Sequence, residues 1–450
     1  MMQIRSTDKG GLTVVVGLGA TGLACLRFLR GQGRRVGVTD SRSEPPRLNA
    51  ARELDAAMPI AVGGFDHALL RSATEIVLSP GVPCDEPVLR EARAAGIPVI
   101  GEIELFARHA NGPVVGITGS NGKSTVTTLL GCMAEAAGRN VAVGGNLGTP
   151  ALDLLRDPAP GAYILELSSF QLETTSSLRP VAAVVLNISA DHLDRHGSVE
   201  RYARIKAGIY NGDGLMVLNA DDSLVMAMAS DDRRQVRFST GLPLTPGDYG
   251  LGRNGEEIWL MHGETRLVEA SSLRIRGIHN LANALAALAL ADALALPRQT
   301  SIEALQAFPG LPHRSQWVAG TGGVDWYNDS KATNIGAACA AINGMPGTLV
   351  LILGGDGKGA DFSPLRGAVD ARIRAVVLIG RDAPIIEQAL SGLVAMVHAT
   401  DMDDAVIRAA ALATPGDSVL LSPACASFDM FSGFEERGRA FAASVGRLPS

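Results

Sequence analysis

The sequence has 450 residues, of which 46% are hydrophobic and 19% are charged, and its formal net charge is −6. This balance is typical of a folded globular protein with two or three domains. The acidic charge and the lack of any basic run argue against a protein that binds nucleic acid.

The first part of the chain alternates short apolar runs with helical patterns. We expect strands at residues 13–16, 36–39, 76–78 and 99–100, and a helix at 23–30. This alternation predicts a parallel sheet covered by helices, and we assign residues 1–102 to a Rossmann-like domain. The apolar run at 12–16 is too short for a signal peptide, so we expect none.

A glycine-rich turn follows the first expected strand. Gly17, Gly19 and Gly22 open the helix, and Asp40 ends the next strand. Glycines let the backbone approach a phosphate, whose charge a helix N-terminus stabilises. The pattern predicts a nucleotide site, although close helix packing or NAD binding would need the same glycines.

A second α/β block, assigned to residues 103–310, resembles an ATPase domain in its order of elements. Strands are expected at 114–117, 163–167 and 181–188, with a helix from Ser124, while residues 221–269 show little periodicity. The Ala- and Leu-rich run at 281–296 is interrupted by Asn283 and Asp292. It is shorter than the ~20 residues of a membrane span, so we expect a buried helix.

The most informative motif of this block is TGSNGKST at residues 118–125, between a strand and a helix. In a phosphate loop, backbone N–H groups surround phosphate oxygens, Lys123 neutralises their charge and the Ser124 hydroxyl binds Mg²⁺. The spacing departs from G-x-x-x-x-G-K-[ST] because residue 117 is Ile. A glycine-rich turn without function is the alternative.

Polar residues follow the next two expected strands. Glu166 could supply a carboxylate to Mg²⁺, or could be a solvated residue at a strand end. The segment 187–196 contains Asp191, His192 and His196, which are metal-capable groups at the edge where loops of a parallel sheet gather. Ordinary loop histidines would show the same spacing.

Lys206 lies in a helical pattern four residues after Tyr202, near its apolar face. A lysine in such a place usually extends its ammonium to water. An inward-facing, functional lysine is the other interpretation.

The third block follows residues 308–312 and carries expected strands at 348–353, 375–379 and 418–421. We assign residues 311–450 to a second Rossmann-like domain, which completes a three-domain α/β protein. Cysteines are odd in number, scattered and without a CxxC pair: Cys25, Cys84, Cys132, Cys339 and Cys425. They indicate reduced thiols in a cytoplasmic protein.

Taken together, motifs along nearly the whole chain resemble the Mur ligase family. They lie at 116–125, 145–148, 165–173, 277–283, 310–314, 328–334, 353–362 and 421–428, of which the last three are the most specific. The likeness is strongest to members that add D-glutamate to a UDP-linked muramoyl-alanine. No Asp-Asn-Pro-Arg sequence, expected in members that add diaminopimelate or lysine, is present.

The resemblance implies three sets of ligand contacts. Uridine nucleotide contacts fall to Ala20, Thr21, Asp40, Ser41, Arg42 and Asn146. ATP contacts fall to Gly119, Asn121, Gly122, Lys123, Ser124, Thr125, Asn280, Asn283, Arg314, Asp329 and Lys331. D-Glutamate contacts fall to Thr333, Lys358, Ser427, Phe428 and Phe434, where Phe428 replaces an expected Leu.

It also implies ATP and two Mg²⁺ ions as cofactors. The metal contacts would come from Ser124, Glu166, His192 and a Lys206 carbamylated by CO₂. The catalytic set would be Lys123, Asn146, His192 and Lys206.

The implied activity is ATP-dependent amide formation in the synthesis of peptidoglycan precursors, through an acyl phosphate, by a cytoplasmic monomer. A dehydrogenase would use the first glycine motif but leave the Lys123 loop unexplained. A regulatory NTPase would not join an amine, and a folylpolyglutamate synthase would not need the uridine-type first block.

Overall fold

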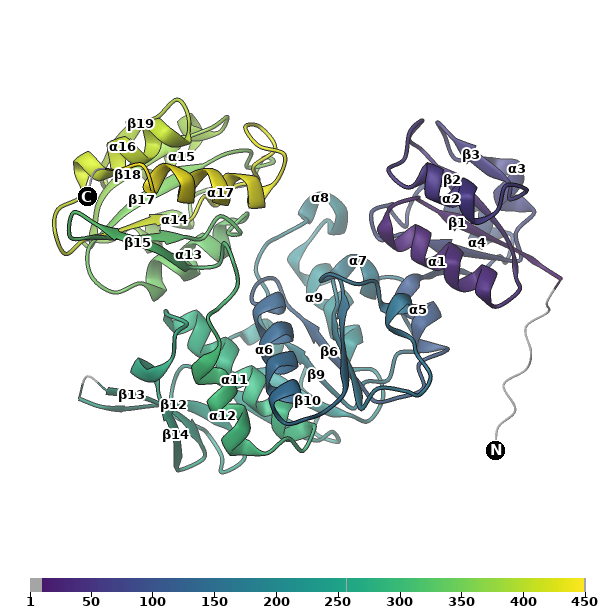
Figure 1. Cartoon of the computed structure of the whole chain (residues 1–450), viewed down its shortest axis with the longest axis horizontal. Coiled ribbons are helices and arrows are strands. Elements are labelled where there is room, and N and C mark those ends of the chain that lie inside the picture. Colours follow the sequence, from purple (N-terminus) through teal and green to yellow (C-terminus); the bar gives the residue numbers. More distant parts are fainter. Residues whose placement is uncertain (1–9, 256, 449–450) are drawn as a thin grey trace.

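The computed structural model describes residues 10–255 and 257–448. Three α/β domains follow one another along the chain, each built around its own sheet (Figure 1). The predicted fold class is therefore confirmed. All five cysteines are free. No helix in the described part of the chain combines the length and apolar composition needed to cross a bilayer.

The first domain holds a five-stranded parallel sheet in the order β3-β2-β1-β4-β5. Val14, Val15 and Val16 of its central strand are fully buried because helices cover both faces of the sheet. The strands are β1 (Leu12–Val16), β2 (Arg35–Asp40), β3 (Ile60–Val62), β4 (Glu75–Leu78) and β5 (Val99–Gly101). The helices are α1 (Ala20–Gly31), α2 (Leu48–Leu54), α3 (His67–Arg71) and α4 (Pro87–Ala94).

The central domain has a nine-stranded sheet in the order β14-β13-β12-β11-β10-β9-β6-β8-β7. Its parallel strands are β6 (Val114–Thr118), β7 (Val141–Gly145), β8 (Ala162–Glu166), β9 (Ala182–Val185), β10 (Leu215–Asn219) and β11 (Gln235–Phe238). The antiparallel extension is β12 (Tyr249–Asn254), β13 (Glu257–His262) and β14 (Thr265–Glu269). Its helices are α6 (Lys123–Ala136), α7 (Ser169–Leu172), α8 (Leu193–His196), α9 (Val199–Ala207), α10 (Ser223–Met226), α11 (Ile278–Ala293) and α12 (Arg298–Ala307).

The antiparallel extension differs from the expectation of little structure at 221–269. Four strands and α10 lie within that stretch. The alternation that marks a strand is weak there because a bulge shifts the register between Leu260 and Met261. Glycines at 250 and 252 also remove two side chains from β12.

The third domain has a six-stranded sheet in the order β15-β16-β20-β17-β18-β19, in which only the β15–β16 pair is antiparallel. Its strands are β15 (Gln316–Thr321), β16 (Val324–Asn328), β17 (Leu349–Gly354), β18 (Ile373–Ile379), β19 (Ala395–His398) and β20 (Ser418–Leu421). Its helices are α13 (Ile335–Gly344), α14 (Leu365–Ala368), α15 (Ala383–Leu390), α16 (Met402–Leu412) and α17 (Phe434–Val445).

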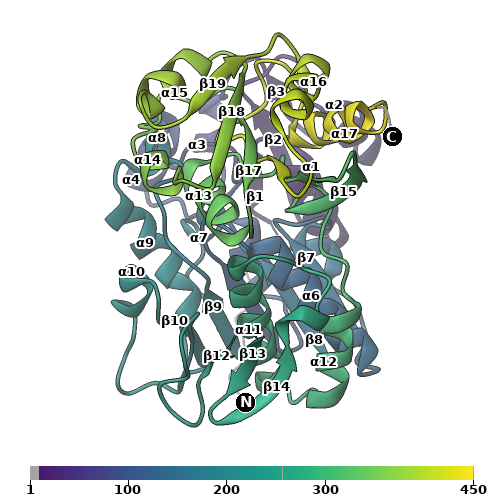
Figure 2. The ribbon, with the colours of Figure 1, turned by 90° about the vertical axis from the view of Figure 1, so that its left-hand side faces the viewer.

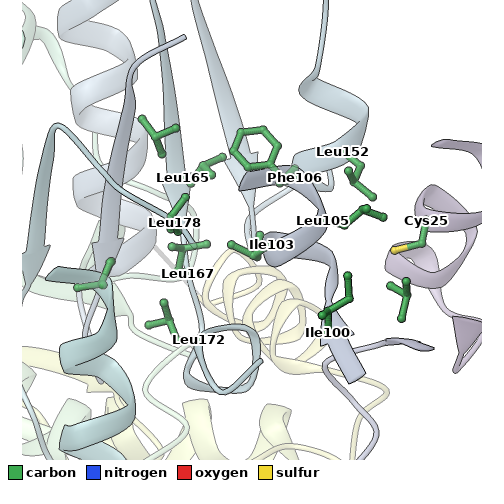
Figure 3. Packing of buried hydrophobic residues seen from close by; sticks show 14 of the residues in the cluster. Cys25, Ile100, Ile103, Leu105, Phe106, Leu152, Leu165, Leu167, Leu172 and Leu178 are labelled. Carbon is green, nitrogen blue, oxygen red and sulfur yellow. The ribbon is translucent and has the colours of Figure 1, made fainter. Parts of the chain in front are cut away.

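The two junctions between domains differ in character. Helix α5 (Glu102–Ala107) joins the first and central domains, and its Ile103, Leu105 and Phe106 belong to one continuous apolar core. That core runs from Cys25 on α1 to Leu165 on β8 (Figure 3). The third domain keeps separate apolar cores and is stacked on the central domain, with α13 against α11 (Figure 2).

Candidate active site

The phosphate-loop motif forms a tight turn between β6 and α6. Gly119 and Gly122 have φ values of +151° and +83°, which L side chains rarely adopt. The Lys123 ammonium folds back over the loop and donates hydrogen bonds to the carbonyl oxygens of Gly119, at 2.7 Å, and Ser120, at 2.9 Å. The loop thus concentrates backbone donors and one positive charge at the N-terminus of a 14-residue helix.

Helix α11 lies directly against this turn. A Cβ on Gly122 would stand 2.3 Å from Oδ1 of Asn283, so only glycine lets the two elements meet. Asn283 donates to Oδ1 of Asn280 at 3.3 Å, and Asn280 donates to the carbonyl oxygen of Arg276 at 2.8 Å. The structure therefore brings both asparagines of the predicted ATP set to the phosphate loop.

Glu166, the last residue of β8, is only 2% exposed. Its Oε1 accepts a 2.7 Å hydrogen bond from Asn146, whereas its Oε2 has no hydrogen-bond partner among the described residues. A buried carboxylate oxygen left in this way is costly unless a cation satisfies it. Glu166 therefore fits a metal contact rather than a solvated strand end.

The Ser124 hydroxyl, the other predicted metal contact of the loop, is buried and accepts a 2.8 Å hydrogen bond from Arg314. Across residues 10–255 and 257–448, no three His, Cys, Asp or Glu side chains gather as a metal cage. Mg²⁺ keeps several waters and needs only one or two carboxylates.

Lys206 faces inward and is 1% exposed, which excludes the interpretation that its ammonium reaches water. It donates to Oγ1 of Thr118 at 3.2 Å and to the carbonyl oxygen of Gly119 at 2.9 Å, and it lies 4.6 Å above the Tyr202 ring. Burial, reinforced by the nearby charge of Lys123, lowers its pKa well below that of a free lysine. Neutral amine is therefore accessible at this position.

The two histidines of the segment 187–196 have different surroundings. His196 is fully buried, places Nε2 3.0 Å from the Ser169 hydroxyl and packs on Tyr202, so it has a structural role. His192 has φ = +53°, is 42% exposed and lies 3.7 Å from Oδ2 of Asp191. Its partial burial lowers its pKa, against the opposing charge of Asp191.

These groups line one cavity of about 580 Å³ between the central and third domains. From the central domain it receives Lys123, Ser124, Asn146, Glu166, His192 and Lys206. From the chain beyond residue 310 it receives Arg314, Lys331, Thr333 and Phe434. The four predicted catalytic residues and the four predicted metal contacts are therefore neighbours.

A second cavity of about 300 Å³ adjoins it and shares Asn121, Gly122, Arg314 and Lys331. Thr125, Asn280, Asn283 and Asp329 of the predicted ATP set also line it, whereas Gly119 lines neither cavity. A nucleotide with its phosphates at the loop could extend into this space.

The third domain contributes two titratable groups with shifted pKa values. Burial raises the pKa of Asp329 to about 7, although Ser422 and Ser315 each donate to its carboxylate at 2.9 Å. Burial, with the charges of Arg314 and Lys123, lowers the pKa of Lys331 to about 8. The Lys331 ammonium lies 4.0 Å above the ring of Phe434.

The predicted D-glutamate residues are not all gathered. Thr333 and Phe434 line the main cavity. Lys358, Ser427 and Phe428 lie outside its lining, and Phe428 is 68% exposed. A shared role for the five residues remains a prediction.

In the first domain, the glycine turn is close-packed. A Cβ on Gly22 would stand 2.0 Å from the carbonyl oxygen of Gly17, so the packing interpretation is correct for this position. Asp40 accepts hydrogen bonds from the Leu18 amide at 2.6 Å and from the Arg42 guanidinium at 2.7 and 2.9 Å. Burial opposes ionisation, but these bonds lower its pKa. Both carboxylate oxygens of Asp40 therefore accept hydrogen bonds from within the first domain.

Three further predicted uridine contacts lie beside this turn, whereas Asn146, in the central domain, lines the main cavity. Ala20 and Ser41 are exposed and Thr21 is half-buried, each at the carboxyl edge of β1 or β2. That edge is where ligands bind in open α/β sheets.

Several residues near the cavity were not singled out by the sequence. Asn187 accepts a 2.8 Å hydrogen bond from the Asn121 amide and so shapes the phosphate loop. Asn334 donates to Asp191 at 3.2 Å across the domain boundary. Asn187 and Asn334 lie within the motifs at 187–196 and 328–334. Their contacts join residues that are 66 and 143 positions apart, which sequence spacing does not reveal.

Three family models match the chain. They are described as Mur ligase MurD-like, N-terminal domain (residues 11–101), Mur ligase middle domain (117–291) and Mur ligase, glutamate ligase domain (313–425). The matched ranges coincide with the three sheets.

Curated relatives are similar over almost their full length. A UDP-N-acetylmuramoylalanine–D-glutamate ligase of Nitrosococcus oceani is 54% identical, with 97% of each chain covered. One of Methylococcus capsulatus is 52% identical over 98% of this chain and 96% of its own.

Solved structures share the fold at lower identity. A MurF ligase from Thermotoga maritima, in complex with ADP, gives a TM-score of 0.62 at 18% identity, covering 92% of this chain and 96% of its own. A UDP-N-acetylmuramate-alanine ligase, MurC, from the same organism gives 0.57 at 19%, covering 96% and 98%. These two show the three-domain fold.

Proposed function

This chain belongs to the Mur ligase family, and from that premise we propose that it joins D-glutamate to UDP-N-acetylmuramoyl-L-alanine at the expense of ATP. The products would be the amide, ADP and phosphate. Relatives that are about half identical to it over nearly their whole length are UDP-N-acetylmuramoylalanine–D-glutamate ligases, which supports this substrate choice.

The observation that carries the proposal is the convergence of charge in the 580 Å³ cavity. Lys123, Arg314 and Lys331 place positive charge around the phosphate loop, and Glu166 presents an unsatisfied oxygen beside them. Such a site suits a reaction in which two anions must meet.

In the first step, an oxygen of the alanyl carboxylate attacks the γ-phosphorus of ATP, and the bond from that phosphorus to ADP breaks. Repulsion between the carboxylate and the triphosphate opposes this approach. Lys123 is placed to hold the transferred phosphoryl group, since its ammonium already lies over the loop. The loop amides and the α6 N-terminus would orient the remaining phosphates.

Mg²⁺, when bound, would neutralise part of the phosphate charge. Ser124 and Glu166 are the residues fitted to one ion, and His192 with a modified Lys206 to a second. Asn146 donates to one oxygen of Glu166, and the other oxygen has no hydrogen-bond partner among the described residues.

In the second step, the amine of D-glutamate attacks the carbonyl carbon of the acyl phosphate. The tetrahedral intermediate expels phosphate, and the nitrogen loses a proton. His192 could accept that proton only when its ring is not bound to the second ion; its partial burial lowers its pKa and so favours the neutral ring. Thr333 and Phe434, with Lys358, Ser427 and Phe428 after domain movement, would hold the amino acid.

We further propose that Lys206 reacts as a neutral amine with CO₂ to form a carbamate. Its burial and lowered pKa favour the uncharged form that this reaction needs. The Lys206→Ala variant should lose most activity and regain part of it with added acetate or formate, which can occupy the vacated space. Full activity of the variant without any added carboxylate would overturn the carbamate.

Residues 1–102, 103–310 and 311–450 would act as the uridine nucleotide, ATP and amino-acid domains of a cytoplasmic enzyme. The deciding experiment measures phosphate release from ATP with UDP-N-acetylmuramoyl-L-alanine and, side by side, D-glutamate, L-glutamate, L-alanine and diaminopimelate. Release is expected with D-glutamate alone. Equal release with no amino acid would instead indicate an NTPase, and preference for another amino acid would refute the substrate choice.

A further inference from the structure

The N-terminal end of α13 seats the third domain on the phosphate loop. Asn334 is the N-cap of this helix, and its Oδ1 accepts a 2.8 Å hydrogen bond from the Ala337 amide. Its Nδ2 points the other way, across the domain boundary. It donates to Oδ2 of Asp191 at 3.2 Å and lies 3.4 Å from Oδ1 of Asn121.

The backbone of α13 approaches the central domain closely at the same point. A Cβ on Gly336 would stand 2.8 Å from the Ser189 hydroxyl oxygen and 3.0 Å from its Cβ. Ser189 is itself tied to the loop, because its amide donates to the Ser120 hydroxyl at 2.9 Å. The contact at Asn334 is therefore part of a close-packed interface, in which Asn334 and Gly336 of the third domain meet Asp191 and Ser189 of the central domain. We call this interface the seat.

Thr333 gives this seat a functional meaning. It precedes Asn334 directly and lines the main cavity together with Lys123 and Glu166. Consecutive Cα atoms are ~3.8 Å apart, so fixing Asn334 against the central domain also fixes Thr333 over the phosphate loop. The Asn334 side-chain amide donates a hydrogen bond to Asp191, and because the amide is neutral it adds no further charge near Lys123 and Lys206.

We propose that Asn334 is a positioning residue that sets the register of the third domain on the phosphate loop, so that the amino acid meets the activated carboxyl group. This inference rests on the proposed ligase function. Asn334 acts through Asp191 and Thr333, and it need not touch a substrate.

Two variants distinguish the two hydrogen bonds of the Asn334 side chain, namely the cap of α13 and the bond to Asp191. Asn334→Ser and Asn334→Asp both keep an oxygen that can cap α13, because Ser and Asp are good N-cap residues. The first replaces the amide donor to Asp191 with a shorter hydroxyl, and the second places a carboxylate against a carboxylate. The matched control is Asp401→Ser, which alters the N-cap of α16 in the same domain, where the Asp404 amide donates at 2.9 Å.

We expect all three variants to melt within a few degrees of the wild type. The KM for D-glutamate should rise about tenfold in Asn334→Ser and further in Asn334→Asp, because loss of a cross-domain hydrogen bond and added repulsion weaken the seat. The Kd for ADP, measured calorimetrically, should stay within about threefold. A KM that matches the Asp401→Ser control in both Asn334 variants would overturn the proposal.

Small-angle scattering supplies a readout that does not depend on turnover. The wild type and Asp401→Ser should have the same radius of gyration, and Asn334→Asp should have a larger one because the third domain is held less closely to the central domain. Equal radii in all three proteins would overturn the role of Asn334. If the wild type formed no amide at all, the ligase proposal would fail. The scattering comparison would still test whether Asn334 positions the third domain.

Discussion

Lys123 is the residue on which phosphoryl transfer depends most directly. Its ammonium is held over the phosphate loop by two carbonyl oxygens, and it is the cation of the loop itself. No other side chain within the loop can replace its charge.

We therefore expect Lys123→Ala to lower kcat by about a thousandfold or more while the protein stays folded. ADP release under saturating substrates measures the loss, and far-UV circular dichroism checks the fold. A variant that kept activity within tenfold of the wild type would remove the phosphate-loop assignment.

Asp329 offers a test through pH. Burial raises its pKa from 3.8 to about 7, so the folded state holds a proton that the unfolded state releases. Its contribution to stability is complete below pH ~4 and declines as pH rises to about 7. Asp329→Asn should remove this decline, which amounts to at most about 4 kcal/mol.

The measurement compares thermal unfolding of Asp329→Asn and the wild type at pH 5 and pH 8. The variant should gain relative to the wild type at pH 8. A difference between the two proteins that does not change with pH would show that the Asp329 carboxyl has an ordinary pKa.

At this scale, the sequence predicts the residue types of the site better than their surroundings. The motif at 118–125 identifies Lys123 and Ser124 because a strand, a turn and a helix must follow in that order. The spacing from Tyr202 predicts that Lys206 lies near an apolar face, and the cation–π contact confirms the pairing. Complete burial of Lys206 and the contact of Asn334 with Asp191 depend on distant segments.

Helix α6 has a left-handed glycine at each end, which allows a matched comparison. Gly122 at its start has φ = +83° and stands against Asn283, whereas Gly138 just beyond its end has φ = +68° and open space around it. An alanine at either position costs ~1–2 kcal/mol of backbone strain, but only the first also causes a collision.

Gly122→Ala should therefore weaken ATP binding by about a hundredfold, because Asn283 and the loop must separate. Gly138→Ala should lower the melting temperature with ATP affinity unchanged. Calorimetric titration with a non-hydrolysable ATP analogue distinguishes the two. Equal affinities in both variants would show that contact between α11 and the loop is dispensable.

Among elements, the buried parallel strands are the ones that sequence predicts well. The expected strands at 13–16, 114–117 and 348–353 agree with β1, β6 and β17, because each is a continuous apolar run. The sequence patterns do not predict the edge strands β3, β7, β14, β15 and β19, nor the interior strands β10–β13 and β16. Most residues of β14, β15 and β19 are partly or fully exposed, so tertiary pairing rather than composition decides that they are strands.

The whole molecule consists of one firmly joined pair of domains and a third that is attached by polar contacts. Phe106 packs edge-on against Tyr163 at 5.1 Å within the core shared by the first two domains. The third domain meets the central one through hydrogen bonds such as those of Arg314 and Asn334. Polar junctions of this kind permit relative motion.

Scanning calorimetry should accordingly resolve two transitions, one for the first two domains together and one for the third. Phe106→Ala should destabilise only the former, by about 3–5 kcal/mol. The matched variant Phe441→Ala, in the third-domain core beside Trp326, should affect only the latter. A single transition displaced by both variants would mean that all three domains unfold as one unit.

One carbonyl group has a consequence for how the enzyme receives its nucleotide. The oxygen of Gly119 accepts hydrogen bonds from both Lys123, at 2.7 Å, and Lys206, at 2.9 Å. Burial and the charge of Lys123 lower the pKa of Lys206, so the Lys123 ammonium and a neutral Lys206 amine share this single acceptor. An incoming phosphate must compete with the Gly119 carbonyl oxygen for these two lysine side chains. Its binding would relieve their crowding around that oxygen. Substitution of either lysine should therefore reduce the effect of substituting the other, so that the effects of the two substitutions on activity are less than additive.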